Sequence, residues 1–311
     1  MKIPLRVTVR RAISPGENKE ANAGPSHAVE AAMEGTAIKA PHTHRFTPVG
    51  ACIYCGATEG RLTEEHIIPK GLGGTLVLPQ ASCDACATTT SLFEMRVLRG
   101  FLDRGRQAMG IKGRKAHKRA LPDTLTQTFI QPDESTVERE VPWNDGIKVM
   151  HLPVFVLPAF LDPRKPMDPR VQKLEIMAVD TLHFGVGQGE LVREYQAQGV
   201  RFDDRLDVWA FAKLLAKIAH GYHVAIHGMF PLQESPLVPI ILGQRSDALN
   251  WIGNTLEDPL PSGGTALHLL QHLPLEADDG GRGAVVRIKL FATDPTPTYA
   301  LATRLEAPEG E

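Results

Sequence analysis

Alternating apolar and polar side chains mark the first predicted strand of this 311-residue chain. Residues 3–9 read Ile-Pro-Leu-Arg-Val-Thr-Val, which is the period of a half-buried strand. We expect this strand to pair with a sheet that is formed by residues elsewhere in the chain. Residues 62–68 also look like a strand, broken at Pro69, and residues 75–78 look like a second, short one. The loop between them contains glycines that supply positive φ angles, namely Gly71, Gly73 and Gly74.

A helix is predicted directly after the second of these strands. It opens around Cys83 and Cys86, with Ser82 or Asp84 as its cap, and it ends before Gly100. Its apolar positions are Leu92, Phe93, Met95, Val97 and Leu98. Strand, loop, strand and helix together predict a small ββα unit.

The clearest helical pattern of the chain covers residues 203–228. Asp203 or Asp204 is predicted to cap its start, and Gly228 suits its end. Because its apolar surface is broad, we expect this helix to be the buried spine of the second half. The apolar positions are Leu206, Trp209, Phe211, Leu214, Leu215, Ile218, Tyr222, Val224 and Ala225.

Polar residues of the same helix have two competing explanations. His223 and His227 are four residues apart, a spacing that can bind zinc, but no glutamate accompanies them as in H-E-x-x-H. We interpret these two and His220 as a polar stripe or as histidines at the edge of the core. Lys213 and Lys217 are typical of a solvated face, with an extended basic face as the alternative.

The rest of the second half predicts a mixture of strands and turns. Residues 149–160 and 174–184 look like strands. Residues 284–291 and 298–304 flank a turn-prone segment at Asp294, which predicts a closing hairpin. The pattern of this half is that of an α+β fold.

Composition predicts a soluble globular protein. Hydrophobic residues make up 42% of the chain, so it can bury a core, and the formal net charge of −2 means that affinity for nucleic acid requires a local basic patch. No segment approaches the roughly 18 apolar residues of a membrane span, and the N-terminus lacks the apolar run of a signal peptide. We therefore expect a cytoplasmic protein without membrane contact.

All four cysteines of the chain lie in the ββα segment as two C-x-x-C pairs, Cys52 with Cys55 and Cys83 with Cys86. In a reducing compartment such a cluster holds zinc more often than it forms disulfides. Each pair presents two thiolates from one tight turn, and two such turns complete a tetrahedral site. The spacing predicts a structural Zn²⁺ site.

Glu65 and His66, between the two pairs, are the candidate catalytic residues. Neutral His66 can take a proton from an attacking water, while Glu65 points the other way along the strand and can hold a divalent cation. That cation would neutralise charge on a phosphate and on the departing oxygen. Hard oxygen ligands favour Mg²⁺, with Mn²⁺ as a substitute. Exposed strand carboxylates and a structural histidine beside zinc are the plainer alternative.

The motifs C-x-x-C, EEHIIPKGLGG and LVLPQASCDAC, over residues 52–91, resemble the zinc-anchored branch of the HNH, or ββα-metal, endonucleases. The resemblance implies that His66 is the general base, Glu65 the acidic metal ligand and the cysteines the structural zinc ligands. The sequence departs from the family at Ala87, where members usually carry Asn or His and where alanine cannot bind a metal. Glu94, about two turns further on the same helix face, is the one substitute with a carboxylate and the reach.

A basic segment follows the candidate nuclease unit. Nine Lys and Arg residues between positions 96 and 119 stand against one acid, Asp103. A solvated helical face is the ordinary explanation, whereas charge neutralisation of a phosphate backbone explains the position beside a nuclease unit. The candidate nucleic-acid contacts are Lys70, Arg96, Arg99, Arg104, Arg106, Lys112, Arg114 and Lys115.

Together these patterns predict an α+β protein in which a small zinc-stapled HNH module precedes a larger α+β domain of unassigned fold. Residues 1–48 form an N-terminal strand and flexible linker, residues 49–120 the module with its basic extension, and residues 121–311 the accessory domain. The predicted function is a metal-dependent endonuclease of double-stranded DNA, acting as a candidate homodimer. Two alternatives stay open: a nucleic-acid-binding protein whose catalytic site has decayed, and a nuclease controlled by a sensor or partner-binding second half.

Overall fold

The structure is a computed structural model that describes residues 2–10, 43–111, 121–162, 164–170, 173–185, 188–255, 257–276 and 282–306. Most of the expected linker over residues 14–48 lies outside this set. The described chain contains both helices and mainly antiparallel sheets, so the predicted α+β class is confirmed.

The cysteine-bearing segment folds as the predicted ββα unit. Its elements are β2 (His44–Arg45), β3 (Leu62–His66), η1 (Lys70–Leu72), β4 (Leu76–Cys83) and α1 (Asp84–Leu98). β3 and β4 pair antiparallel with Leu62 opposite Cys83, and β2 pairs with the other edge of β4. The caps predicted for α1 are wrong: Cys83, the last residue of β4, holds the N-cap position, and no side chain caps the helix.

The N-terminal strand joins a sheet that is remote in sequence, as predicted. β1 (Lys2–Arg10) pairs antiparallel with β9 (Gly199–Asp207) along its whole length. This pairing keeps Asp203 and Asp204 in extended conformation. Neither residue can therefore cap the long helix, and that prediction is wrong.

The long helix α4 (Val208–His227) begins one residue after β9 ends. The side chain of Asp207 caps it by accepting a hydrogen bond of 3.2 Å from the backbone N–H of Ala210. Gly228, with φ of 82°, ends it as predicted. Nearly every residue of α4 before its last turn is buried, which confirms that it is a spine of the fold. Among the described residues, no helix is both long and apolar enough to cross a membrane.

The strands of the described chain form four sheets, with the orders β1-β9-β5-β6, β10-β13-β12-β11, β2-β4-β3 and β7-β8. The remaining strands are β5 (Thr124–Ile130), β6 (Thr136–Pro142), β7 (Lys148–Phe155), β8 (Ile176–Phe184), β10 (Ile252–Asn254), β11 (His268–Glu276), β12 (Arg282–Leu290) and β13 (Thr298–Glu306). The predicted closing hairpin is confirmed, because β12 and β13 pair antiparallel.

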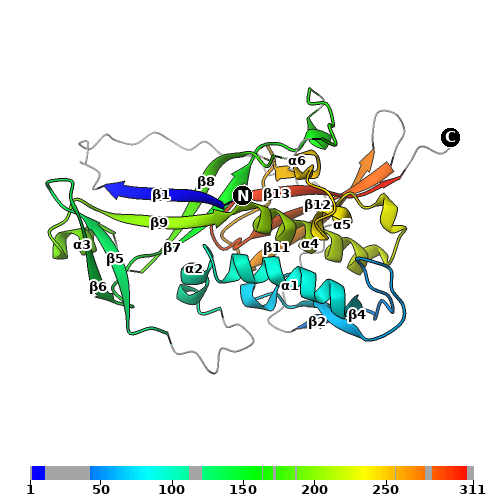
Figure 1. Cartoon of the computed structure of the whole chain (residues 1–311), viewed down its shortest axis with the longest axis horizontal. Helices are drawn as coiled ribbons and strands as arrows, with labels where there is room; N and C mark the ends of the chain where they lie inside the picture. Colours follow the sequence, from blue (N-terminus) through cyan, green and yellow to red (C-terminus); the bar gives the residue numbers. More distant parts are fainter. Residues whose placement is uncertain are drawn as a thin grey trace, which may run out of the picture.

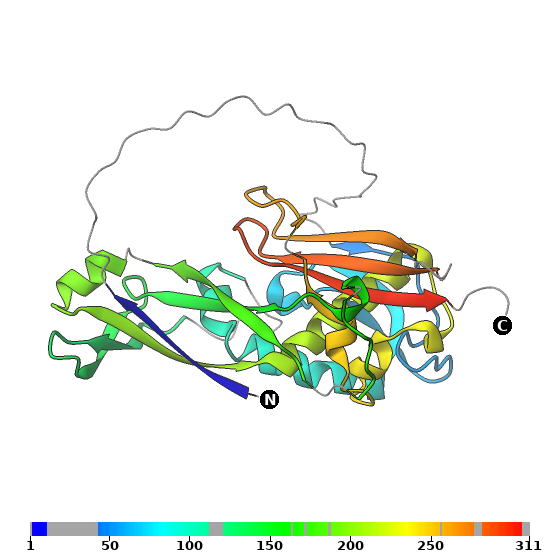
Figure 2. The ribbon, with the colours of Figure 1, turned by 90° about the horizontal axis from the view of Figure 1, so that it is seen from above.

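Short helices connect these strands. They are α2 (Asp103–Ala108), η3 (Ala159–Leu161), α3 (Gln188–Glu194), η4 (Leu232–Glu234), α5 (Leu237–Ile241) and α6 (Ala248–Trp251). Figure 1 shows the sheet that contains β1 and β9 at one end of the long axis, and α1, α4 and the C-terminal sheet towards the other. The view from above separates the same two ends (Figure 2).

One hydrophobic core runs from the cysteine unit into the second half. It joins Ile53 and Ile67 of the unit to Phe211 and Ile218 of α4, and it continues to Tyr299 of β13. A second, smaller cluster packs around Phe129, Val141, Val200 and Phe202. The domain boundary predicted at residue 120 stays a prediction, but apolar packing is continuous across it.

Candidate functional site

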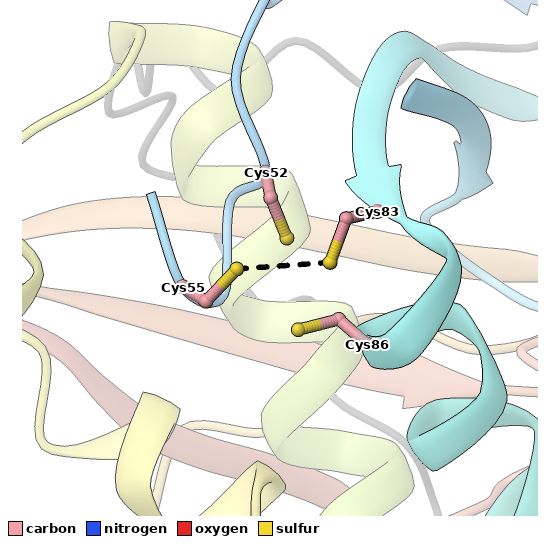
Figure 3. Close-up of side chains that lie close together, drawn as sticks. All are labelled: Cys52, Cys55, Cys83 and Cys86. Carbon is pink, nitrogen blue, oxygen red and sulfur yellow. Dashed lines mark hydrogen bonds between the residues drawn. The ribbon is translucent and has the colours of Figure 1, made fainter. Parts of the chain in front are cut away.

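Four cysteine side chains converge at the start of α1 (Figure 3). Cys52 and Cys55 precede β3, Cys83 ends β4, and Cys86 lies in the first turn of α1. All four thiols are free, and their sulfur atoms lie within 4.8 Å of one another. The Cys55 and Cys83 sulfurs are 3.7 Å apart, close to the edge of about 3.8 Å of a tetrahedron with Zn–S bonds of about 2.3 Å. The cluster therefore fits the predicted structural zinc.

The local environment of Cys83 favours its thiolate form. A hydrogen bond from the backbone N–H of Cys86 lowers the pKa of Cys83 to about 7. Burial raises the pKa of Cys86, and its sulfur neighbours in the cluster raise it further. Because the thiolate is the form that ligates zinc, we expect zinc binding to release protons from the cluster.

Strand β3 sorts its polar side chains onto two faces. Glu65 is buried, at 6% exposure, whereas Glu64 and His66 lie on the opposite, more exposed face. Glu64 approaches His66 with 3.5 Å between Oε1 and Nε2. The guanidinium of Arg45, from β2, lies 3.0 Å from the other oxygen of Glu64. The outer face of the strand thus carries an imidazole, a carboxylate and a guanidinium in contact.

The inner face of β3 meets a lysine from α4. Lys217, 1% exposed, extends its ammonium to within 2.6 Å of Glu65 Oε1 and 2.9 Å of Glu94 Oε1. It also donates to the main-chain oxygen of His66 and lies 3.4 Å from that of Ile67. Glu65 and Glu94, which the sequence assigns to one metal, are indeed brought together. The atom that lies between the two carboxylates is Lys217 Nζ.

Charge in this inner cluster favours the ammonium form of Lys217. Burial opposes the charged form, but the two carboxylates more than offset this, so the pKa of Lys217 is raised. Burial raises the pKa of Glu65, and Lys217 counteracts that effect only in part. The buried Tyr54 adjoins the same carboxylates, and its pKa is raised by burial and by their negative charge. The cluster thus places one ammonium between two carboxyl groups and beside a buried phenol.

A histidine one turn further along α4 ties the helix to the cysteine unit. His220 Nε2 bonds to the main-chain oxygen of Ile53 at 2.7 Å, and its Nδ1 lies 3.3 Å from the hydroxyl of Ser235. Burial lowers the pKa of His220 to about 4, so the ring is neutral at pH 7. His223 is also buried and contacts Thr303 at 3.0 Å. Among the described residues, one group of three or more His, Cys, Asp or Glu side chains has a geometry that could hold a metal ion. That group is the four cysteines.

The predicted basic contacts divide into three groups. Arg106 lies inside the protein, where it donates to the main-chain oxygen of Leu98 at 2.7 Å and pairs with Asp103 at 2.5 Å. It stabilises the end of α1 and is only 13% exposed, so we no longer count it as a nucleic-acid contact. The contacts that remain exposed are Lys70, Arg96, Arg99 and Arg104. The contacts outside the described residues are Lys112, Arg114 and Lys115.

Sequence reasoning missed Lys217 and the partners of His66. The prediction that Lys217 belongs to a solvated face is wrong, because its side chain is buried. One signal was available: Lys217 follows Leu214 by three residues and precedes Ile218, so it lies within the apolar surface of the helix. Glu64 carried a signal too, since side chains two apart on a strand share a face and His66 is two residues away.

The family model of HNH endonucleases matches residues 52–93. No curated protein and no solved structure matches the chain. The match covers the cysteine pairs, β3, β4 and most of α1, so the resemblance inferred from the motifs is confirmed for this segment. It supports a nuclease-type function in general, with nucleic acid as the substrate.

Proposed function

We propose that this protein is an endonuclease that hydrolyses phosphodiester bonds of DNA, with His66 as the general base. The supporting observation is the position of His66 on the outer face of β3, inside the segment that matches HNH endonucleases. Glu64 lies 3.5 Å from its Nε2. A partly exposed imidazole beside a carboxylate is suited to accept a proton and to hold the positive charge that results.

The chemical step uses residues of the outer face. His66 accepts a proton from a water molecule, and the oxygen of that water forms a bond to phosphorus. The bond from phosphorus to the leaving sugar oxygen breaks, and that oxygen takes a proton from solvent. Glu64 stabilises the imidazolium, and the guanidinium of Arg45 adds positive charge beside the site.

A divalent metal, Mg²⁺ or Mn²⁺, would supply charge neutralisation at the phosphate and at the leaving oxygen. Glu65 and Glu94 offer the right kind of ligand, but both are bonded to the buried ammonium of Lys217. With Lys217 in that position the two carboxylates do not fit a divalent ion. The metal predicted on Glu65 would require Lys217 to leave these oxygens.

Contacts with DNA are assigned to the exposed basic residues around the module. Lys70 lies in η1, four residues beyond His66. Arg96 lies in the last turn of α1, Arg99 follows the end of that helix, and Arg104 lies in α2. Such side chains neutralise backbone phosphates without reading sequence. We therefore propose that the substrate is double-stranded DNA, that the protein cuts it with low sequence specificity, and that it does so in the cytoplasm. We also propose that a homodimer is the form that cuts both strands.

A plasmid-nicking experiment tests the proposed function. Zinc-loaded protein is incubated with supercoiled DNA, with and without Mg²⁺, and the open-circular product is measured over time. His66→Ala should abolish nicking because it removes the base. His44→Ala is the matched control, since His44 is an exposed histidine in β2 of the same sheet. Equal nicking by wild type and His66→Ala would refute the role of His66.

The alternative of a DNA-binding protein without activity is favoured by two observations. Ala87 stands where the family carries a metal ligand, and Lys217 binds the two carboxylates that could replace it. This alternative predicts a salt-sensitive mobility shift of duplex DNA and no cleavage with any divalent metal. Cleavage that His66→Ala abolishes would exclude it.

A further inference from the structure

Lys217 is a buried charge that the proposed mechanism does not use. It lies between apolar residues of α4, and its side chain is 1% exposed. A buried ammonium is strongly unfavourable unless charged or polar partners surround it. Its partners therefore explain why a lysine is tolerated at this position of the helix.

Oxygen atoms from β3, from the residue that follows it and from α1 surround the ammonium of Lys217. Glu65 of β3 and Glu94 of α1 supply carboxylates at 2.6 and 2.9 Å, and His66 supplies its main-chain oxygen. The main-chain oxygen of Ile67 lies 3.4 Å away. Two carboxylates with main-chain carbonyls form the kind of shell that hard divalent cations take in proteins. In this protein that shell surrounds a lysine side chain.

Contacts on both sides of Lys217 hold α4 against the cysteine unit and the end of β9. His220, three residues further on, bonds to the main-chain oxygen of Ile53 at 2.7 Å. Gly221 lies against the end of β3, since a Cβ added there would meet Ile67 Cγ1 at 3.7 Å. Asp207 caps the start of the helix. These three contacts fix α4 on both sides of Lys217.

We propose that Lys217 is the resident cation of the HNH module and occupies the position between Glu65 and Glu94 where a divalent ion would otherwise bind. Through its bond to the main chain of His66, it also connects the candidate base to a helix of the second half. This proposal deepens the proposed function and rests on it for the role of His66. The occupancy of the oxygen shell is independent of whether DNA is cut.

A divalent ion and the ammonium cannot both lie between Glu65 and Glu94. Mg²⁺ bonds to oxygen at about 2.0–2.1 Å, so an ion placed between the two carboxylates would overlap the position that Lys217 Nζ now holds. The like charges would also repel at this short range. Removing the ammonium while keeping both carboxylates should therefore create a divalent site that the natural protein does not have.

Mn²⁺ binding to the zinc-loaded full chain, followed by electron paramagnetic resonance, tests this proposal. Glu65→Gln should leave the Mn²⁺ binding of the wild-type protein unchanged. Lys217→Met should gain one Mn²⁺ per chain with an affinity at least tenfold above that of the wild type, and an added Glu94→Gln should remove it. Lys213→Met, four residues earlier on α4, is the matched control for loss of a lysine and should gain no site.

Two results would overturn the proposal. One is a Mn²⁺ site in the wild type that Glu65→Gln weakens tenfold or more, because Glu65 would then be a metal ligand despite Lys217. The other is a folded Lys217→Met variant that gains no Mn²⁺. If Lys217→Met does not fold, the comparison of wild type with Glu65→Gln decides alone. None of these outcomes requires cleavage, so failure of the nuclease assay is distinguishable from failure of this proposal.

Discussion

Replacing Lys217 by methionine should destabilise the protein through the two carboxylates that it leaves behind. Removing one partner of a buried ion pair costs about 3–5 kcal/mol. The side chains of Lys217 and Glu65 are 1% and 8% exposed, which favours the upper part of this range, whereas Glu94, at 20%, retains some water and lowers the value. We expect a loss of about 3–4 kcal/mol in the free energy of unfolding at pH 7.5.

The loss should shrink as the pH falls. Burial already raises the pKa of Glu65, and without Lys217 the attraction that lowers it is gone. A carboxyl group whose pKa is higher in the folded than in the unfolded state binds a proton on folding. The stability of the variant therefore rises as the pH falls from the raised folded-state pKa towards the ordinary value. The recovery amounts to at most about 1.4 kcal/mol per pH unit for each such carboxyl group.

Urea unfolding of zinc-loaded wild type and Lys217→Met, at pH 7.5 and 5.5, measures both effects. Far-ultraviolet circular dichroism and tryptophan fluorescence serve as probes. The triple variant Lys217→Met, Glu65→Gln, Glu94→Gln removes all three charges and should recover most of the lost stability. Lys213→Met controls for the loss of a lysine from α4. A Lys217→Met variant as stable as the wild type at both pH values would refute the buried cluster.

Three further predictions follow from the zinc site and from α4. Cys83→Ser should reduce bound zinc below one per chain and lower the melting temperature, as measured by elemental analysis and calorimetry; unchanged zinc content would contradict the four-cysteine site. His220→Gln should flatten the acid-side decline of stability, because the pKa of His220 is lowered to about 4 in the folded state and the unfolded chain alone binds this proton as the pH falls from about 6.5. The difference in slope between wild type and variant should approach 1.4 kcal/mol per pH unit near pH 5, and identical slopes would be inconsistent with a buried neutral ring. Residues 121–311 expressed alone should not give a cooperative unfolding transition, since α4 loses its packing against Ile53 and Ile67; a stable, well-dispersed fragment by nuclear magnetic resonance would show two independent domains.

Features of the fold that depend on local pattern were predictable from the sequence. The alternation in residues 3–9 and the cysteine spacing are properties of short segments, and the structure contains the corresponding strand and cluster. The start of α4 was not predictable in this way. Its cap is at Asp207, because β9 continues to that residue by pairing with β1, where the partner of Asp207 is Lys2 near the start of the chain.

In the candidate site, too, features that depend on local pattern were predictable and features that depend on remote contacts were not. Strand alternation predicts that Glu65 and His66 point to opposite faces, and they do. Which face is buried depends on the helix that covers it, and that helix is remote in sequence. Lys217 is 151 residues beyond the carbonyl that it binds at His66. No spacing rule links two such positions, so the ammonium between Glu65 and Glu94 could be found only in the folded chain.

The contacts of α4 also show that residues 121–311 pack directly against the HNH segment. Lys217 and His220 reach the HNH segment from a helix of residues 121–311, and the hydrophobic core continues through the same helix. These contacts place a buried charge of the second half on the strand that carries the candidate base. We therefore expect the HNH segment and α4 to unfold together.

The proposal that His66 is the general base is tested most directly by the rate of a single turnover. Wild type and His66→Ala, each with one zinc per chain, are mixed in excess with an end-labelled DNA duplex, and the rate of strand cleavage is measured. Because a general base contributes about 10²–10⁴-fold, we predict that His66→Ala cleaves at least 100-fold more slowly while it binds the duplex with unchanged affinity. Cleavage by the variant at the wild-type rate would contradict the account.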